Sequence, residues 1–135
     1  MNPGRAATVG LGVDLVRVSR FRRFLDGSRQ GVLERLFTPD ERAYCLARRD
    51  PAPHLAARFA AKEALLKAFG LGLRDGLSWQ DMEVVRDELG KPSFHLSGRA
   101  AQLLAERGLR PPLLSYSHDG DYAMATVILE ASCVC

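Results

Sequence analysis

The sequence has few cysteines and no long hydrophobic run, and each scarcity excludes a class of protein. Three cysteines among 135 residues, an odd number, do not suit a secreted domain held together by disulfides. No stretch approaches the roughly 18 consecutive apolar residues that a membrane-spanning helix needs, and residues 1–7 lack the apolar segment of a signal peptide. We therefore expect a cytoplasmic protein without a membrane partner.

Lysine is also scarce, and the positive charge is unevenly placed. Sixteen of the nineteen basic residues are arginine, and residues 1–35 hold seven arginines against three acidic residues. Such a local patch predicts attraction to a polyanion or to an acidic partner protein. From the charge alone, an ordinary solvated arginine surface fits equally well.

The length and composition indicate one small domain. A chain of 135 residues with 47% hydrophobic residues can build a single core without disulfides. No internal repeat or low-complexity segment divides the sequence. We expect one domain over residues 8–130, flanked by tails at residues 1–7 and 131–135.

The first predicted element is a strand over residues 8–16. Its side chains alternate, with Val9, Leu11, Val13 and Leu15 on one face and Gly10, Gly12 and Asp14 on the other. The two glycines leave the second face bare, so a ligand or another backbone can come close to Asp14. The structural alternative is a strand-end aspartate that caps the next helix.

Residues 17–37 and 38–49 predict two helical segments. The first has apolar residues available for burial and a break near residues 26–28. In the second, Thr38 is placed as an N-cap, with a proline at the first helical position and an acid at the third. This pattern predicts a helix that begins directly after Thr38.

The most pronounced helical pattern lies at residues 54–69. The segment is rich in alanine and leucine and follows Pro51 and Pro53, which we expect to end the preceding helix. Gly70 comes next, and glycine is typical of the position just after a helix.

The remaining elements are mostly strands. Residues 79–85 and 93–96 predict a hairpin-like pair, residues 98–108 a helix, and residues 113–118 and 122–130 a terminal hairpin. This order predicts an α+β fold, in which a small antiparallel sheet packs with helices.

The helix at residues 54–69 also carries most of the candidate chemistry. Arg58 and Lys62 share one face, and Glu63 and Lys67 share another. An ion pair on a solvated helix accounts for Glu63 and Lys67, but a set of two lysines and an arginine also suits a substrate with several phosphates. A glutamate there would repel phosphate unless it holds a cation such as Mg²⁺, with Asp14 as the second carboxylate.

Four segments together indicate a family. They are GLGVDLVRVSRF at residues 10–21, RFAAKEALLKAFG at 58–70, LGKP at 89–92 and SYSHDGDYAMATVIL at 115–129. Their combination resembles the holo-acyl-carrier-protein synthase family, the small 4′-phosphopantetheinyl transferases, over about residues 8–130. The Gly-x-Asp and Phe-Ala-Ala-Lys-Glu-Ala elements are the specific part, whereas Ser-His-Asp alone would be weak.

The resemblance implies an enzyme that transfers the 4′-phosphopantetheine arm of coenzyme A to a serine of an apo acyl carrier protein, for fatty acid biosynthesis. Adenosine 3′,5′-bisphosphate is the other product. The resemblance assigns Mg²⁺ to Asp14 and Glu63, which with Lys67 form the catalytic set. It assigns coenzyme A contacts to Arg58, Lys62, Lys67 and His118 and a loop beside the nucleotide to Gly90 and Pro92. The remaining histidines, His54 and His95, have no such context and are taken as structural.

The resemblance also gives the arginine patch a partner. In this family an acyl carrier protein docks on the helix after the first strand, which here carries Arg20, Phe21, Arg23 and Phe24. Charges would steer the encounter and aromatic side chains would anchor it. Because family members form trimers with active sites at subunit interfaces, we also expect a homotrimer.

Two rival hypotheses remain at this stage. A non-catalytic basic module would bind nucleic acid or an acidic protein through residues 17–35, and Asp14 and Glu63 would then be dispensable. This segment lacks the interleaved aromatics that stack on bases, so we expect no nucleic acid partner. A coenzyme A sensor would bind the same ligand without turnover.

Overall fold

The computed structural model describes residues 6–27, 29–73 and 75–132, and the predicted α+β class is confirmed. The elements are β1 (Ala6–Arg17), α1 (Val18–Asp26), α2 (Gln30–Leu36), α3 (Pro39–Leu46), α4 (Pro51–Phe69), the 3₁₀ turn η1 (Trp79–Asp81), β2 (Met82–Arg86), β3 (Pro92–Leu96), α5 (Gly98–Glu106), β4 (Leu113–Asp119) and β5 (Tyr122–Ser132). Within the described ranges, no helix combines the length and hydropathy needed to cross a membrane.

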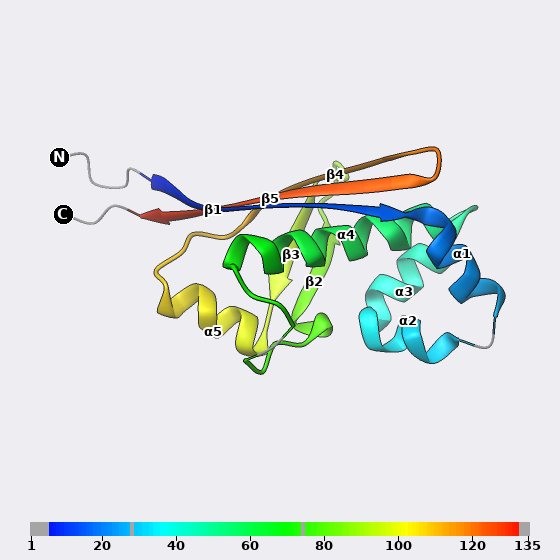
Figure 1. Ribbon diagram of the computed structural model, residues 1–135, viewed down its shortest axis with the longest axis horizontal. Coiled ribbons are helices and arrows are strands. Elements are labelled where there is room, and N and C mark those ends of the chain that lie inside the picture. The colour runs from blue at the N-terminus through cyan, green and yellow to red at the C-terminus, as the bar shows by residue number, and fades with distance from the viewer. Residues whose placement is uncertain (1–5, 28, 74, 133–135) are drawn as a thin grey trace.

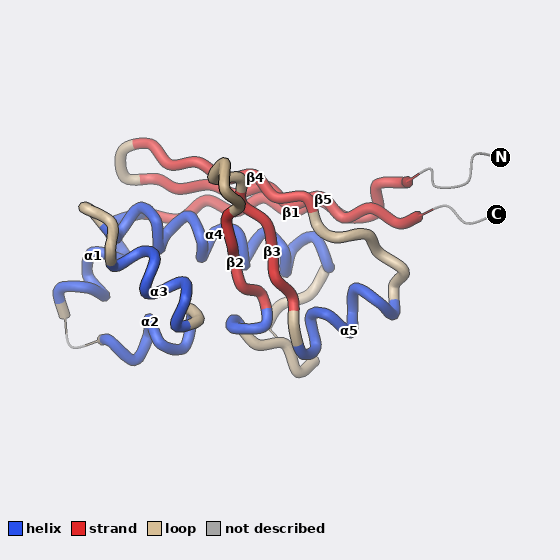
Figure 2. The backbone as a smooth tube through the Cα atoms, turned by 180° about the vertical axis from the view of Figure 1, so that it is seen from behind, coloured by secondary structure: helices blue, strands red, loops and turns tan. Residues whose placement is uncertain are grey.

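The strands form two antiparallel sheets rather than one. A three-stranded sheet has the order β1-β5-β4, and β2 pairs with β3 in a separate hairpin. Figure 1 shows α4 lying beneath the three-stranded sheet, with α1, α2 and α3 gathered near one end of α4 and α5 near the other. Seen from behind in Figure 2, the β2–β3 hairpin crosses α4 between these two groups.

The long strands extend beyond the predicted domain limits. Ala6 pairs with Ser132 and Ala7 with Ala131, so each predicted tail contributes two residues to the sheet. The rest of both tails, residues 1–5 and 133–135, lies outside the described residues.

The bare glycine face of β1 packs directly on α4. A Cβ atom at Gly12 would lie 1.8 Å from the carbonyl oxygen of Ala64, and one at Gly10 would lie 2.4 Å from that of Ala68. Such distances are far inside van der Waals contact, so only glycine permits this approach of strand and helix backbones. The predicted close approach of another backbone is therefore confirmed, and it brings α4 alongside Asp14.

Helix α4 is the buried centre of the fold, and it begins earlier than the sequence predicts. It starts at Pro51 rather than at residue 54, because N–H groups in the first turn have no partner within the helix and a proline there loses no hydrogen bond. Helix α3 correspondingly ends at Leu46 rather than near residue 49. Gly70 has a φ of 78° and ends α4 as predicted.

Candidate active site

Asp14, Glu63 and Lys67 come from two elements that meet only in the folded chain. Asp14 lies on β1, and Glu63 and Lys67 lie four residues apart on α4. The Lys67 ammonium donates to Asp14 Oδ1 at 2.9 Å and to the carbonyl oxygen of Val13 at 3.0 Å. The first turn of α1 is capped instead by Asp121, whose Oδ1 accepts from the Ser19 N–H at 2.8 Å. Asp14 is therefore not the helix cap that the sequence left open.

The negative charge of Asp14 acts on Glu63. The pKa of Glu63 is raised, first by burial and next by the negative charge of Asp14, while Lys67 and Arg20 lower it. In the described part of the chain, no group of three or more histidine, cysteine, aspartate or glutamate residues is arranged to hold a metal. Mg²⁺ is usually held by one or two carboxylates, with water and phosphate oxygens as its other ligands, whereas a structural zinc site needs four protein ligands. The residues present therefore fit the predicted cation.

Lys62 does not reach the surface, which corrects its predicted role as a phosphate contact. Its side chain is fully buried, and its ammonium donates to Glu41 Oε1 at 2.6 Å and to the carbonyls of Leu36 and Trp79 at 2.8 and 3.0 Å. An ammonium has three donors, and all three are used. Burial lowers the pKa of Lys62, and Glu41 opposes this effect.

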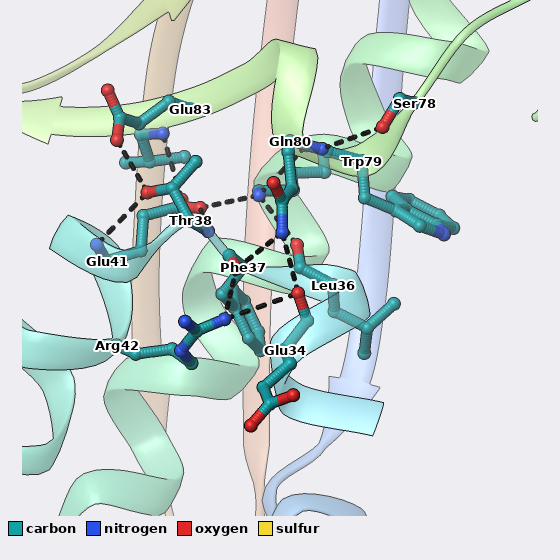
Figure 3. Close-up of polar contacts among 12 residues, drawn as sticks. Glu34, Leu36, Phe37, Thr38, Glu41, Arg42, Ser78, Trp79, Gln80 and Glu83 are labelled. Atoms are coloured by element: carbon teal, nitrogen blue, oxygen red, sulfur yellow. Dashed lines mark hydrogen bonds and ion pairs between the residues drawn. The ribbon is translucent and has the colours of Figure 1, made fainter. Parts of the chain in front are cut away.

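Glu41 explains why a lysine is tolerated in this position. The carboxylate of Glu41 completes the predicted capping box with Thr38 and accepts from the Val84 N–H at 2.9 Å. Thr38 in turn donates to Glu83 at 2.5 Å, as Figure 3 shows. Lys62 and Glu41 thus join α4 to α3 and β2 inside the core.

Three arginine side chains lie around the ring of Tyr44 on α3. The guanidinium carbons of Arg58, Arg48 and Arg86 lie 4.3, 4.6 and 5.5 Å from the ring centroid, at cation–π distances. None of these arginines forms an ion pair within the described residues. Arg58 is only 3% exposed, and its Nε has no hydrogen-bond partner. Arginines without a carboxylate partner, one of which has a buried N–H group without an acceptor, suit an anionic ligand such as phosphate.

Two hollows meet at Arg58 and Arg86. The first, of about 440 Å³, lies between α3, β2 and the turn at residues 87–90 and includes Gly90. The second, of about 340 Å³, is lined by His54, Tyr116, Ser117 and His118 together with the two arginines and Ala57. Of the predicted residues, Arg58 lines both hollows, Gly90 lines the first and His118 the second.

Gly90 and Pro92 act differently within this region. The carbonyl of Gly90 accepts from Arg86 Nε at 3.1 Å, and a Cβ atom at Gly90 would lie 2.6 Å from Arg86 Nη2. Gly90 also has a φ of 85°, which favours glycine. Pro92 begins β3 opposite Arg86 and does not line the larger hollow. Both residues thus bear on the position of Arg86.

His54 belongs to the same cluster, although the sequence alone suggested only a structural role. Its ring centroid lies 5.8 Å from that of His118 and 6.2 Å from that of Tyr44. Burial lowers the pKa of His54, and the charges of His118 and the nearby arginines lower it further. A neutral imidazole still donates one hydrogen bond to a phosphate oxygen.

Sequence reasoning missed Tyr44, Arg48, Arg86 and His54 because they come from separate elements. The arginines at 48 and 86 stand in no motif, and only tertiary packing brings them to one tyrosine ring. Two local signals existed for this cluster: His54 and Arg58 are four residues apart on α4, and Tyr44 and Arg48 are four residues apart in the segment predicted as a helix over residues 38–49.

The predicted docking surface is only partly exposed. Phe21 is fully buried and contacts Phe37 and Phe59, so it cannot anchor a docked protein, which corrects that prediction. Arg23 and Phe24 line a surface hollow of about 320 Å³ together with Gly27 and Arg29. Arg20 is exposed, and its guanidinium lies 5.2 Å from the Phe59 ring centroid.

Comparisons with known proteins give a consistent result. The family model described as the 4′-phosphopantetheinyl transferase superfamily matches residues 10–127. A holo-[acyl-carrier-protein] synthase from Syntrophotalea carbinolica is 62% identical over 123 residues, which cover 91% of this chain and 96% of that relative.

Solved structures are similar along the same length. The crystal structure of holo-[acyl-carrier-protein] synthase from Neisseria meningitidis matches with a TM-score of 0.83 at 34% identity, covering 91% of this chain and 98% of that one. A holo-(acyl-carrier-protein) synthase from Bacillus anthracis, solved in complex with CoA (3′,5′-ADP), matches with a TM-score of 0.76 at 34% identity, covering 93% and 98%.

Proposed function

The chain belongs to the holo-acyl-carrier-protein synthase family of 4′-phosphopantetheinyl transferases, and from this premise we propose that it transfers the 4′-phosphopantetheine arm of coenzyme A to a serine of an apo acyl carrier protein. A new bond forms between the serine oxygen and the phosphorus that bears the pantetheine. The bond from that phosphorus to the bridging oxygen of the diphosphate breaks, and adenosine 3′,5′-bisphosphate leaves. We place the reaction in fatty acid biosynthesis and in the cytoplasm, as the family resemblance implies.

The observation that carries this proposal is the meeting of Asp14 with Glu63 and Lys67. Phosphoryl transfer builds negative charge on phosphate oxygens, so the protein must position the reactants and stabilise that charge. Mg²⁺ held by Asp14 and Glu63 would supply such stabilisation. Lys67, a half-exposed compact cation beside them, suits a phosphate oxygen of the diphosphate. Asp14 and Glu63 also offer carboxylates to receive the serine proton, directly or through an ordered water.

The arginine and histidine cluster is the proposed site for the nucleotide end of coenzyme A. Arg58 lines both hollows and holds a buried, unpaired Nε. His118 and His54 face the same region. Arg58 and Glu63 lie five residues apart on α4, about 7.5 Å along the helix axis and about 140° around it. Coenzyme A carries phosphate groups at both the 3′ and 5′ positions of one ribose, so one ligand offers a separate phosphate to each site.

The arginine surface of α1 and α2 is the proposed docking site for the acidic carrier. Arg17 and Arg22 are already paired with Asp121 and Asp50. Among the described residues of this surface, this leaves four exposed arginines outside any ion pair, namely Arg20, Arg23, Arg29 and Arg35. Phe24, half-buried beside Arg23, offers an aromatic side chain that a partner could contact.

Reversing Arg23 to glutamate is expected to raise the KM for the carrier protein by about tenfold or more, because it places a like charge against an acidic partner. The KM for coenzyme A should change little. The effect should shrink as salt is added, since exposed charges are screened. Steady-state kinetics with each substrate varied in turn would measure this split.

Arg110→Glu is the matched control, because Arg110 is exposed and follows α5 rather than α1. The proposed docking surface would be wrong if Arg23→Glu left the KM for the carrier protein unchanged, or if Arg110→Glu raised that KM as much as Arg23→Glu.

We also propose that the chain assembles as a homotrimer through the outer face of the three-stranded sheet. This face exposes seven large apolar side chains, namely Val9, Leu11, Val13, Leu15, Leu113, Tyr122 and Met124. A contiguous apolar surface of this kind is typical of an interface. Strands β1 and β4 are also the two edges of the sheet, which assembly would protect.

Leu11→Glu is expected to convert the trimer into monomers, because each interface would then bury an unpaired carboxylate. Light scattering after size exclusion would measure the mass of the particle. Leu89→Glu is the control, since Leu89 is 95% exposed on the β2–β3 turn. A trimeric Leu11→Glu variant, or a wild type that is monomeric at assay concentrations, would contradict the proposed interface.

The proposed activity is tested by incubating the protein with apo acyl carrier protein, coenzyme A and Mg²⁺ at a catalytic ratio of enzyme to carrier. Repeated turnover separates an enzyme from a coenzyme A sensor, which would bind the same ligand and leave the carrier unchanged.

A further inference from the structure

We propose that Lys67 and the divalent cation compete for Asp14, so that Lys67 weakens cation binding until a phosphate group draws the lysine away. The inference rests on the metal site of the proposed function. It assigns Lys67 a second task beside phosphate binding, as an internal counter-charge for the two carboxylates. Cation and coenzyme A would then bind cooperatively, because each favours the same position of Lys67.

The contacts of Asp14 leave little room for two cations. Its side chain is 15% exposed, and Oδ1 already accepts a hydrogen bond from the Lys67 ammonium. The same ammonium is fixed by a second hydrogen bond to the Val13 carbonyl. A cation coordinated to this oxygen would lie next to the ammonium, and two positive charges so close repel strongly.

The ion pair between Lys67 and Asp14 can be broken readily, so that a cation can replace the lysine. Lys67 is 53% exposed, so water can solvate its ammonium when the hydrogen bond to Asp14 breaks. Its long flexible side chain extends from a surface position of α4. Lys67 can therefore leave Asp14 at low cost, in contrast to Lys62 on the same helix, which is fully buried and bound by three acceptors.

The positive charge of Lys67 acts on Glu63 as well as on Asp14. Glu63 lies four residues before Lys67 on α4, so the two side chains share one face of the helix, and the Lys67 ammonium lies 2.9 Å from Asp14 Oδ1. The two carboxylates thus need a positive charge between them, and either the ammonium or a divalent cation provides it. The cation displaces the ammonium only when its interaction with the two carboxylates is more favourable than the hydrogen bonds that Lys67 loses.

The test measures Mn²⁺ binding in the absence of coenzyme A, by counting free Mn²⁺ with electron paramagnetic resonance. Lys67→Met should bind Mn²⁺ about threefold to thirtyfold more tightly than the wild type, because the competing positive charge is removed. The same variant should transfer phosphopantetheine poorly. Lys67→Arg, which keeps the charge, should bind Mn²⁺ as the wild type does. Lys91→Met, which removes one exposed lysine from the β2–β3 connection, controls for net charge and should leave the affinity unchanged.

A second readout follows the lysine itself. The sequence has only three lysines, Lys62, Lys67 and Lys91, so their side-chain ¹⁵N signals are resolvable after selective labelling. Mg²⁺ titration should shift the Nζ signal of Lys67 and leave that of Lys62 in place. A Lys67 signal that does not respond to Mg²⁺ would contradict exchange on Asp14.

The outcomes separate this inference from the proposed metal site. Asp14→Asn should abolish the Mn²⁺ binding seen in both the wild type and Lys67→Met. If Asp14→Asn loses Mn²⁺ binding but Lys67→Met binds Mn²⁺ no more tightly than the wild type, the proposed competition is wrong and the proposed metal site is retained. If Asp14→Asn binds Mn²⁺ as well as the wild type does, the metal site and the competition both fail.

Discussion

Replacing Glu63 with glutamine is expected to lower kcat/KM for phosphopantetheine transfer by at least about 100-fold, since even partners of metal ligands contribute about 10–100-fold. Glutamine keeps the size of the side chain and removes its negative charge. The cation would then be held by Asp14 as the only protein carboxylate of the site. Rates are measured from the mass of the carrier protein at saturating coenzyme A.

Excess Mg²⁺ should restore part of the Glu63→Gln activity, because lost affinity can be offset by concentration. The matched control is Glu106→Gln on α5, where an exposed glutamate pairs with Arg99. This control should remain close to the wild-type rate. A near-normal rate for Glu63→Gln would remove Glu63 from the site.

Replacing Lys62 with methionine is expected to destabilise the protein by about 3–5 kcal/mol, the usual cost of breaking a buried ion pair. The change leaves the Glu41 carboxylate buried without its partner, and it removes the donors that satisfy the Leu36 and Trp79 carbonyls. Urea denaturation measures the free energy of unfolding. Where Lys62→Met remains folded, its KM for coenzyme A should stay within about threefold of the wild type.

The double variant Lys62→Met, Glu41→Gln keeps this prediction testable if the single variant is too unstable. Neutralising Glu41 removes the unpaired buried charge, so the double variant should be more stable than Lys62→Met alone by about 1–2 kcal/mol. Lys91→Met, at an exposed lysine, should change stability by less than about 0.5 kcal/mol. A double variant no more stable than Lys62→Met would contradict the cost assigned to the unpaired Glu41 carboxylate. A large rise in coenzyme A KM for Lys62→Met would instead favour a role in ligand binding.

Local patterns in the sequence predicted much of the fold. The capping box of Thr38 and Glu41 and the left-handed Gly70 are decided within a few residues, and both are confirmed. The bare face of β1 was also visible, because alternation in a strand fixes which side chains share a face.

Other features depend on packing between distant elements. Lys62 and Lys67 lie on the same helix, and nothing local indicates that one is buried against Glu41 and the other exposed beside Asp14. Phe21 and Phe24 are similarly alike in sequence, yet only Phe21 is fully buried. The contacts of Arg58 and Arg86 with the Tyr44 ring could not be predicted either, since these arginines come from α4 and β2.

The most direct test of the central claim is the simultaneous measurement of both products in one reaction. Apo acyl carrier protein, coenzyme A and Mg²⁺ are incubated with the protein, and the carrier is weighed by mass spectrometry while released adenosine 3′,5′-bisphosphate is quantified. We predict a carrier heavier by one phosphopantetheine, one nucleotide released for each carrier modified, and no reaction when the acceptor serine is replaced by alanine. A carrier of unchanged mass, with the protein folded and coenzyme A bound, would contradict the account.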